Sequence, residues 1–150
     1  MSDTYQDVSA NGVKLMLFAS VSYPTGVEIA TFNPGEDPIN FDDLKIAETD
    51  MGVNGNLIVY RTPYAYNMVF NITPMTEVDQ IMENIANADR IAAGKVSAKN
   101  ILTLVVIYPQ GRTLTYVDGA MTDCPGGFSS SGNGRINGRR YAMSFRDLVS

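Results

Sequence analysis

The sequence predicts a mainly β protein of the α+β type: an antiparallel β-barrel or sandwich of about six to eight strands with one flanking helix. Two observations support this. Short apolar or alternating runs recur along the chain between turns rich in Gly, Pro and Asn, and only one segment, near residues 77–93, has the apolar spacing of an amphipathic helix. The 150 residues contain no repeat and no linker, so we expect residues 1–150 to form a single domain.

Two strands are predicted close to the N-terminus. Residues 13–23 are rich in Val, Leu, Phe and Met and end at Pro24, and residues 27–32 are apolar at alternate positions. The intervening Thr25-Gly26 favours a turn, so the two strands should pair as a hairpin.

The following segment has weaker signals. Residues 33–38 contain two prolines and are predicted to be a loop, and residues 39–47, which fit neither period, are predicted as a short strand. Residues 48–56 contain Asn-Gly and are predicted to be a turn, whereas residues 57–61 are predicted as a strand that Pro63 ends.

The middle of the chain has the clearest periodicity. Residues 64–72 place aromatic and aliphatic side chains at every second position, which predicts a strand with one buried face. The helix should follow, with an N-cap at Thr73, next to Pro74, or at Thr76, three residues before Asp79. Its expected apolar stripe consists of Val78, Ile81, Met82, Ile85, Ala88 and Ala92.

The last fifty residues are predicted to form three strands and a long loop. Residues 101–108 and 113–121 flank a turn at Pro109-Gln-Gly111. Residues 124–135 are rich in Gly and Ser, and residues 139–146 alternate as a closing strand. The edges of such a sheet need partners, which favours assembly over catalysis.

The composition weakens most catalytic hypotheses. The chain has no histidine, which removes the usual general base and the commonest metal ligand, and we expect no cofactor and no metal. Its single cysteine, Cys124, lies in a turn without an evident activating base. The Gly/Ser segment 126–134 lacks the lysine of a phosphate-binding loop. A net charge of −5 argues against tight binding to nucleic acid.

The sequence also bears on location. The longest unbroken apolar run, residues 104–108, is far too short to span a membrane. The polar, acidic N-terminus lacks the pattern of a secretory signal. We therefore expect synthesis in the cytosol and no membrane partner.

One basic cluster, which consists of Arg135, Arg139 and Arg140, stands out in this acidic chain. Its natural partners are acids from the 36–50 region, above all Asp42 and Asp43, on a neighbouring subunit. These five residues are the predicted subunit interface.

The closing segment resembles a known family. It contains Val117-Asp-Gly-Ala-Met121, then Asp123-Cys-Pro-Gly, then Gly134-Arg-Ile136, and it ends with the strand Arg-Tyr-Ala-Met-Ser-Phe-Arg146. This order of motifs and strands resembles that of tail tube and tube-like baseplate proteins of contractile-tailed bacteriophages. The fold of those proteins is similar to that of the tube protein of type VI secretion systems.

The resemblance implies a structural virion protein without enzymatic activity. Its subunits would form stacked homo-hexameric rings around a lumen for DNA, contact tail sheath or baseplate proteins, and assemble in the host cytoplasm. An early extended segment, here residues 33–56, would reach a neighbour. The same fold also serves rings that initiate or terminate the tube, so both placements stay open.

Two hypotheses from other classes remain. Tyr60, Tyr64 and Tyr66 could line the ligand site of a small β-barrel, although tyrosines are also frequent in cores and interfaces. Alternatively, clustered carboxylates at residues 36–50 could serve a hydrolase, although neighbouring residues of a strand point to opposite faces.

Overall fold

The computed structural model describes residues 13–29, 39–91, 94–130 and 132–149. The predicted loop at residues 33–38, the polar start at residues 1–12 and the end of the second predicted strand lie outside these ranges. The elements of the described part, in chain order, are β1 (Lys14–Ala19), β2 (Tyr23–Ile29), β3 (Ile39–Phe41), β4 (Ala47–Met51), β5 (Leu57–Arg61), β6 (Tyr66–Ile72), α1 (Glu77–Asp89), β7 (Leu102–Ile107), β8 (Thr113–Asp123) and β9 (Arg139–Val149).

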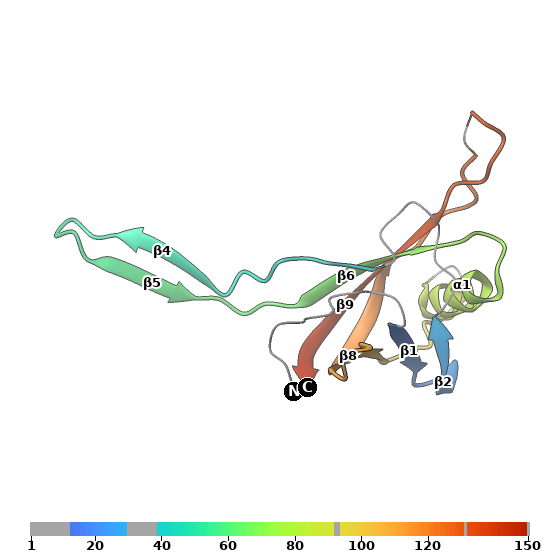
Figure 1. Ribbon diagram of the computed structural model, residues 1–150, viewed down its shortest axis with the longest axis horizontal. Coiled ribbons are helices and arrows are strands. Elements are labelled where there is room, and N and C mark those ends of the chain that lie inside the picture. The colour runs from blue at the N-terminus through green and yellow to red at the C-terminus, as the bar shows by residue number, and fades with distance from the viewer. Residues whose placement is uncertain (1–12, 30–38, 92–93, 131, 150) are drawn as a thin grey trace, which may run out of the picture.

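Seven strands form one antiparallel sheet in the order β2-β1-β7-β8-β9-β6-β3, which confirms the predicted mainly β class. The sheet curls into a half-barrel (Figure 1). Phe41 of β3 stacks on Tyr116 of β8 with ring centroids 5.6 Å apart, although β9 and β6 lie between these strands. Three strand spacings in a flat sheet would separate the two backbones by about 14 Å, so this contact depends on the curl.

The core lies on the inner face of the curled sheet. Met82 and Ile85 of α1 are completely buried against it, and the helix therefore covers part of this face (Figure 1). On the strands, alternation works as predicted: the buried side is formed by Met68, Phe70 and Ile72 of β6 and by Tyr141, Met143 and Phe145 of β9.

The helix has its N-cap at Thr76, which is one of the two predicted cap residues. Thr76 Oγ1 accepts a hydrogen bond from the backbone N–H of Asp79 at 3.3 Å, and the Thr76 hydroxyl donates to the carbonyl of Thr73. The predicted end near residue 93 is wrong. Arg90 takes an extended conformation with φ −72° and ψ 137°, so α1 stops at Asp89. Ala92, the last member of the expected apolar stripe, lies outside the described residues.

The predicted hairpin exists, but its turn lies elsewhere. β1 pairs with β2 through a turn at residues 20–22, and Pro24 lies inside β2. The side chain of Asn100 explains the position of this turn, because its Oδ1 accepts hydrogen bonds from the backbone N–H groups of Val21 and Ser22, each at 2.9 Å. Pro24 is tolerated because β2 is an edge strand, where a missing donor costs little.

The C-terminal elements follow the prediction, with β7 slightly shorter than expected and β8 and β9 longer. The turn after β7 is closed by a hydrogen bond from Gly111 N–H to the Tyr108 carbonyl, and β8 and β9 extend to Asp123 and Val149. The Gly/Ser loop between them, residues 124–138, contains a bridge between Ser130 and Ile136. No helix in the described ranges is long and apolar enough to cross a membrane.

The largest departure from prediction concerns residues 47–61, which we call the arm. Residues 48–51, predicted as a turn, form most of β4, which pairs with β5 from Ala47↔Arg61 to Met51↔Leu57. The turn is confined to residues 52–56, where Gly52 N–H donates to the Asn56 carbonyl at 2.8 Å. This two-stranded ribbon projects far from the rest of the molecule (Figure 1).

Candidate assembly surfaces

The arm exposes apolar side chains on both faces. Residues directly opposite in an antiparallel pair share a face, so Met51, Leu57 and Val59 lie on one face. We call it the apolar face, although Thr49 and, at the root of the arm, Arg61 also lie on it. Met51, Leu57 and Val59 are 70%, 61% and 43% exposed. Soluble monomers rarely leave a large apolar patch uncovered, which indicates a surface made for contact with another protein.

The opposite face of the arm combines apolar and acidic groups, and we call it the mixed face. Ile58 pairs with Asp50, and Tyr60 pairs with Glu48. Lys45, which precedes the arm, forms an ion pair with Glu48, whereas Asp50 is exposed near the far end of β4. This face therefore offers both an apolar contact and a carboxylate to a partner.

The three tyrosines considered as a ligand site lie in two separate places. Tyr60 lies on the arm, whereas Tyr66 on β6 contacts Tyr64 edge-on at 5.7 Å and Tyr116 at 5.5 Å. Tyr116 also packs on Phe145, with centroids 6.0 Å apart. Tyr66 and Tyr116 therefore belong to an aromatic cluster of the core, and burial raises the pKa of the Tyr116 hydroxyl.

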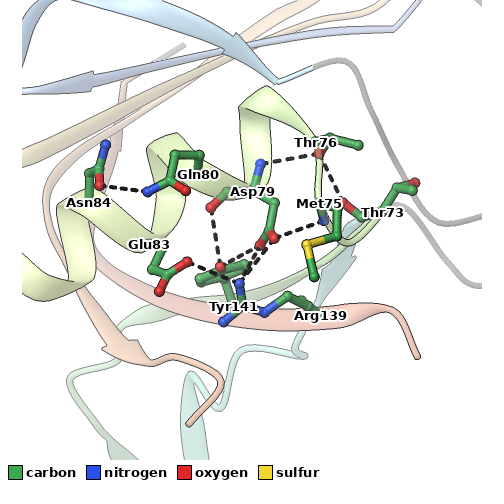
Figure 2. A network of polar contacts seen from close by, with 9 residues as sticks. All are labelled: Thr73, Met75, Thr76, Asp79, Gln80, Glu83, Asn84, Arg139 and Tyr141. Atoms are coloured by element: carbon green, nitrogen blue, oxygen red, sulfur yellow. Dashed lines mark hydrogen bonds and ion pairs between the residues drawn. The ribbon is translucent and has the colours of Figure 1, made fainter. Parts of the chain in front are cut away.

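Arg139 is buried, although its predicted place in a subunit interface requires an exposed cation. Its side chain is 3% exposed, and Nη1 lies 3.0 Å from both carboxylate oxygens of Asp79 and 3.2 Å from Glu83 Oε2 (Figure 2). Both acids come from α1 of the same chain. The guanidinium joins the start of β9 to the first turns of the helix, and burial keeps it away from the acids of a neighbour.

Two aromatic rings complete this buried network. The Tyr141 hydroxyl donates to Asp79 Oδ1 at 2.7 Å, and Phe128 of the Gly/Ser loop lies over the Arg139 guanidinium, 4.2 Å from Cζ to the ring centroid. Burial and this hydrogen bond raise the pKa of Tyr141 well above its usual range. Burial alone would lower the pKa of Arg139, but its hydrogen bonds with Asp79 and Glu83 outweigh that effect and raise it.

The other four residues of the predicted interface lie at the surface. Asp42 and Asp43 follow β3, Arg140 is exposed on β9, and Arg135 belongs to the exposed Gly/Ser loop. That loop projects from the body in a different direction from the arm (Figure 1). Pairing of these acids and arginines between subunits stays a prediction.

The residues considered for catalysis do not converge. Cys124 is exposed, and the described residues contain no group of three or more Cys, Asp or Glu side chains arranged to hold a metal ion. The acids at positions 42, 43, 48 and 50 are distributed between the arm and the segment that leads to it, and those at positions 36 and 37 lie outside the described ranges.

The fold of this chain is similar to that of chains from contractile injection systems. The chain is similar to a chain of the sheath/tube terminator of an extracellular contractile injection system (PVC), with 12% identity over 97% of each chain and a TM-score of 0.58. It is also similar to a chain of the anti-feeding prophage baseplate, with 10% identity over 99% of this chain and 96% of the other and a TM-score of 0.58. A chain of the PVC sheath–tube complex gives 10% identity, coverage of 95% and 91%, and a TM-score of 0.53.

A family model matches nearly the whole sequence. Residues 6–149 match the model of the family described as tail fiber protein gp32, and the chain belongs to that family. No curated protein matches the chain in sequence. The predicted resemblance to tube-like proteins of contractile tails is confirmed, and the protein is a structural component associated with a virion tail.

Proposed function

We propose that this protein is a non-enzymatic subunit of a contractile tail, which joins copies of itself into a hexameric ring around a channel through which DNA passes. The subunit is made in the host cytoplasm and assembles there with tail tube, sheath or baseplate proteins. The exposed apolar face of the arm is the observation that carries this proposal.

The arm is poorly suited to a lone subunit. Within the described sheets, β4 and β5 pair only with each other, and Met51, Leu57 and Val59 remain in water. Removing apolar surface from water stabilises a complex by about 25 cal/mol for each Å². A neighbour that covered these side chains would therefore gain binding energy at a site that the single chain leaves open.

The charge balance suits a channel. Phosphate contacts with Lys and Arg supply most of the nonspecific affinity for DNA. A subunit with a net charge of −5 has little tendency to retain DNA, so a ring of such subunits would let the polymer slide through.

A test of the proposal compares assembly of the wild type with that of Leu57→Asp/Val59→Asp. Purified protein is concentrated and followed by size-exclusion chromatography with light scattering and by electron microscopy. We expect rings for the wild type and monomers for the variant, because two carboxylates on the apolar face would have to be desolvated at the interface.

The matched control is Ile91→Asp/Val96→Asp, which places the same two added charges at exposed aliphatic residues outside the arm. It should assemble like the wild type, and all three proteins should keep the same circular dichroism spectrum. A wild type that stays monomeric at every concentration, or an arm variant that still forms rings, would refute the proposal.

A second candidate places the ring at one end of the tube, as a terminator or baseplate ring. It is favoured by the two chains with a TM-score of 0.58, which come from a terminator and a baseplate, against 0.53 for the chain from the sheath–tube complex. Electron microscopy separates the two candidates: a tube subunit stacks into long filaments, whereas a terminal ring stays isolated or stacks only once.

The exposed part of the predicted interface belongs to the same proposal. Asp42 and Asp43 of one subunit would pair with Arg135 and Arg140 of the next, which favours one register of the ring through charge complementarity. Arg140→Glu should weaken ring formation, and Asp42→Arg in the same chain should restore part of it. Equal ring formation by Arg140→Glu and the wild type would remove these residues from the interface.

A further inference from the structure

A shallow groove crosses the outer face of the sheet, opposite the side that carries α1. It has a volume of about 790 Å³, and its floor includes the small side chains of Ala65, Ala120 and Ser144. Ser144 lies between Met143 and Phe145, whose side chains enter the core, so it points to the outer face.

Larger side chains stand around this floor. Tyr64, Lys99 and Ile101 line the groove, and all three are exposed. The small residues between them leave a hollow. The side chains of the rim form an apolar and charged surface that the single chain does not cover. Such a surface is typical of a contact site.

The groove spans the centre of the sheet. Ala120 and Ser144 are partners in the β8–β9 ladder, Ile101 precedes β7, and Ala65 precedes β6. The four strands β7, β8, β9 and β6 are consecutive in the sheet, so the groove extends about 14 Å across them at the usual strand spacing. The two backbones of a ribbon lie about 5 Å apart, so both of them fit within this extent.

The backbone around the groove is unusual. Lys99 and Asp118 both have a φ of 54°, in the left-handed region, which is uncommon for Lys and more frequent for Asp. At Asp118 it coincides with a register shift between β7 and β8. Bulges of this kind redirect side chains, and here the Asp118 carboxylate receives two hydrogen bonds from Arg146, at 2.9 and 2.6 Å.

The charges of the groove complement those of the arm. The groove carries Lys99, Arg146 and Asp118, and because Arg146 already pairs with Asp118, the charge left for a partner is that of Lys99. The mixed face of the arm carries Asp50 beside Ile58. A small-residue floor with a cationic rim therefore matches an apolar ribbon with a carboxylate.

The groove lies at the root of the arm of its own chain, because Tyr64 and Ala65 belong to the connector that joins β5 to β6. The arm leads away from this root (Figure 1). The arm therefore does not cover the groove of its own chain, which leaves the groove open to the arm of a second copy. A contact between two different surfaces of identical subunits repeats around a ring when the rotation closes.

We infer that the mixed face of the arm of one subunit lies in the outer groove of the next copy, with Ile58 over Ala120 and Asp50 beside Lys99. This inference rests on the proposed function and names the surface that receives the arm. The apolar face of the arm then points away from the groove and is covered by a further copy of the chain, so ring formation needs both faces of the arm.

Cysteine crosslinking tests the contact directly. In a Cys124→Ser background, one chain carries Ile58→Cys and a second chain carries Ala120→Cys, and the two are mixed, oxidised and analysed by denaturing electrophoresis. We expect a dimer band that neither chain gives when it is oxidised alone. We expect no such band when Val59→Cys replaces Ile58→Cys, because Val59 lies on the other face of the arm.

Charge exchange gives an independent readout. Asp50→Lys and Lys99→Glu should each weaken assembly about tenfold, as judged from the concentration at which rings appear, and the double variant should recover most of this loss. The control is Lys14→Glu, which makes the same change at an exposed lysine of β1 away from the groove and should assemble normally.

The outcomes separate the inference from the proposed function. Rings without the Ile58–Ala120 crosslink, or equal crosslinking of the Val59 control, would overturn the groove as the receiving surface and leave the ring intact. Protein that remains monomeric would overturn both. A specific crosslink together with recovery in the double variant would establish the contact.

Discussion

The hydroxyl of Tyr141 lies 2.7 Å from Oδ1 of Asp79, so a strand near the C-terminus donates a hydrogen bond to the first turn of the helix. Arg139, two residues earlier on the same side of β9, binds both oxygens of that carboxylate. Asp79 Oδ2 also accepts from the N–H of Met75, just before the helix. One buried carboxylate thus fixes the helix start to the last strand (Figure 2).

Replacing Arg139 should remove a large part of the stability of the subunit. Arg139→Met keeps the apolar stem but leaves the buried Asp79 carboxylate without its cation, which typically costs about 3–5 kcal/mol. Urea unfolding of the two proteins measures the difference. The matched control is Arg140→Met, the next residue on β9, whose exposed side chain should contribute little. Equal losses from the two variants would contradict the structural role of the buried ion pair.

The raised pKa of Tyr141 predicts a loss of stability in alkaline solution. Below about pH 10, the usual tyrosine pKa, the hydroxyl is protonated in both the folded and the unfolded state. Above it, the unfolded chain loses this proton first, so the free energy of unfolding falls as the pH rises.

Tyr141→Phe isolates this contribution. The variant should be less stable at neutral pH by about 1.5–3 kcal/mol, the usual value of a hydrogen bond to a charged group. It should also lose less stability than the wild type between about pH 9 and 11, a range that brackets the ordinary tyrosine pKa. Unfolding curves at several pH values measure both effects, and parallel alkaline profiles would contradict the assignment.

Gly119 provides a packing test under the groove. A Cβ atom at this position would collide with the ring of Phe145, its partner on β9. Gly119→Ala should therefore destabilise the fold by about 1–3 kcal/mol through overpacking, as measured by urea unfolding. Gly127→Ala, where no atom of the described structure lies within 4 Å of the added carbon, is the control. A second substitution, Phe145→Leu, should recover part of the loss in the Gly119→Ala background.

Asn100 should contribute strongly to stability although it belongs to no strand or helix. Besides accepting from Val21 and Ser22, its amide nitrogen donates to Ser22 Oγ and to Asp89 Oδ1, each at 2.9 Å. Asn100→Ala removes these bonds and leaves two turn N–H groups without their acceptor, at a cost of about 1–3 kcal/mol for each group that stays buried.

The control for Asn100 is Asn84→Ala, which removes an exposed amide that donates to the Tyr23 hydroxyl. Thermal unfolding of both variants compares the two sites. A similar change in melting temperature for both would show that the turn does not depend on Asn100.

Periodicity predicts the parts of the fold in which one face is buried. The alternation in residues 66–72 and 139–146 is clear because every second side chain enters the core. The start of α1 is also predictable, since Thr76 and Asp79 have the spacing of a cap. These signals depend on residues that are close together in the chain, so they can be recognised from the sequence alone.

The arm and the buried Arg139 are not predictable in the same way. The arm is exposed on both faces, so burial does not impose alternation on it, and its acids and Asn-Gly pair imitate a loop. In the sequence, Arg139 looks like any basic residue in a surface cluster. Its partner Asp79 lies 60 positions away, and only the packing of α1 on the sheet brings the two together.

The arm also has a consequence for the timing of assembly. An isolated two-stranded hairpin is only marginally stable in water, and in the described part of the chain no third strand pairs with the arm. In the assembly proposed above, a free subunit therefore holds its arm loosely, and the first encounter of two subunits would order the arm against an unfavourable entropy. Growth of the proposed ring should then show a lag and a critical concentration, which light scattering at a series of protein concentrations would measure.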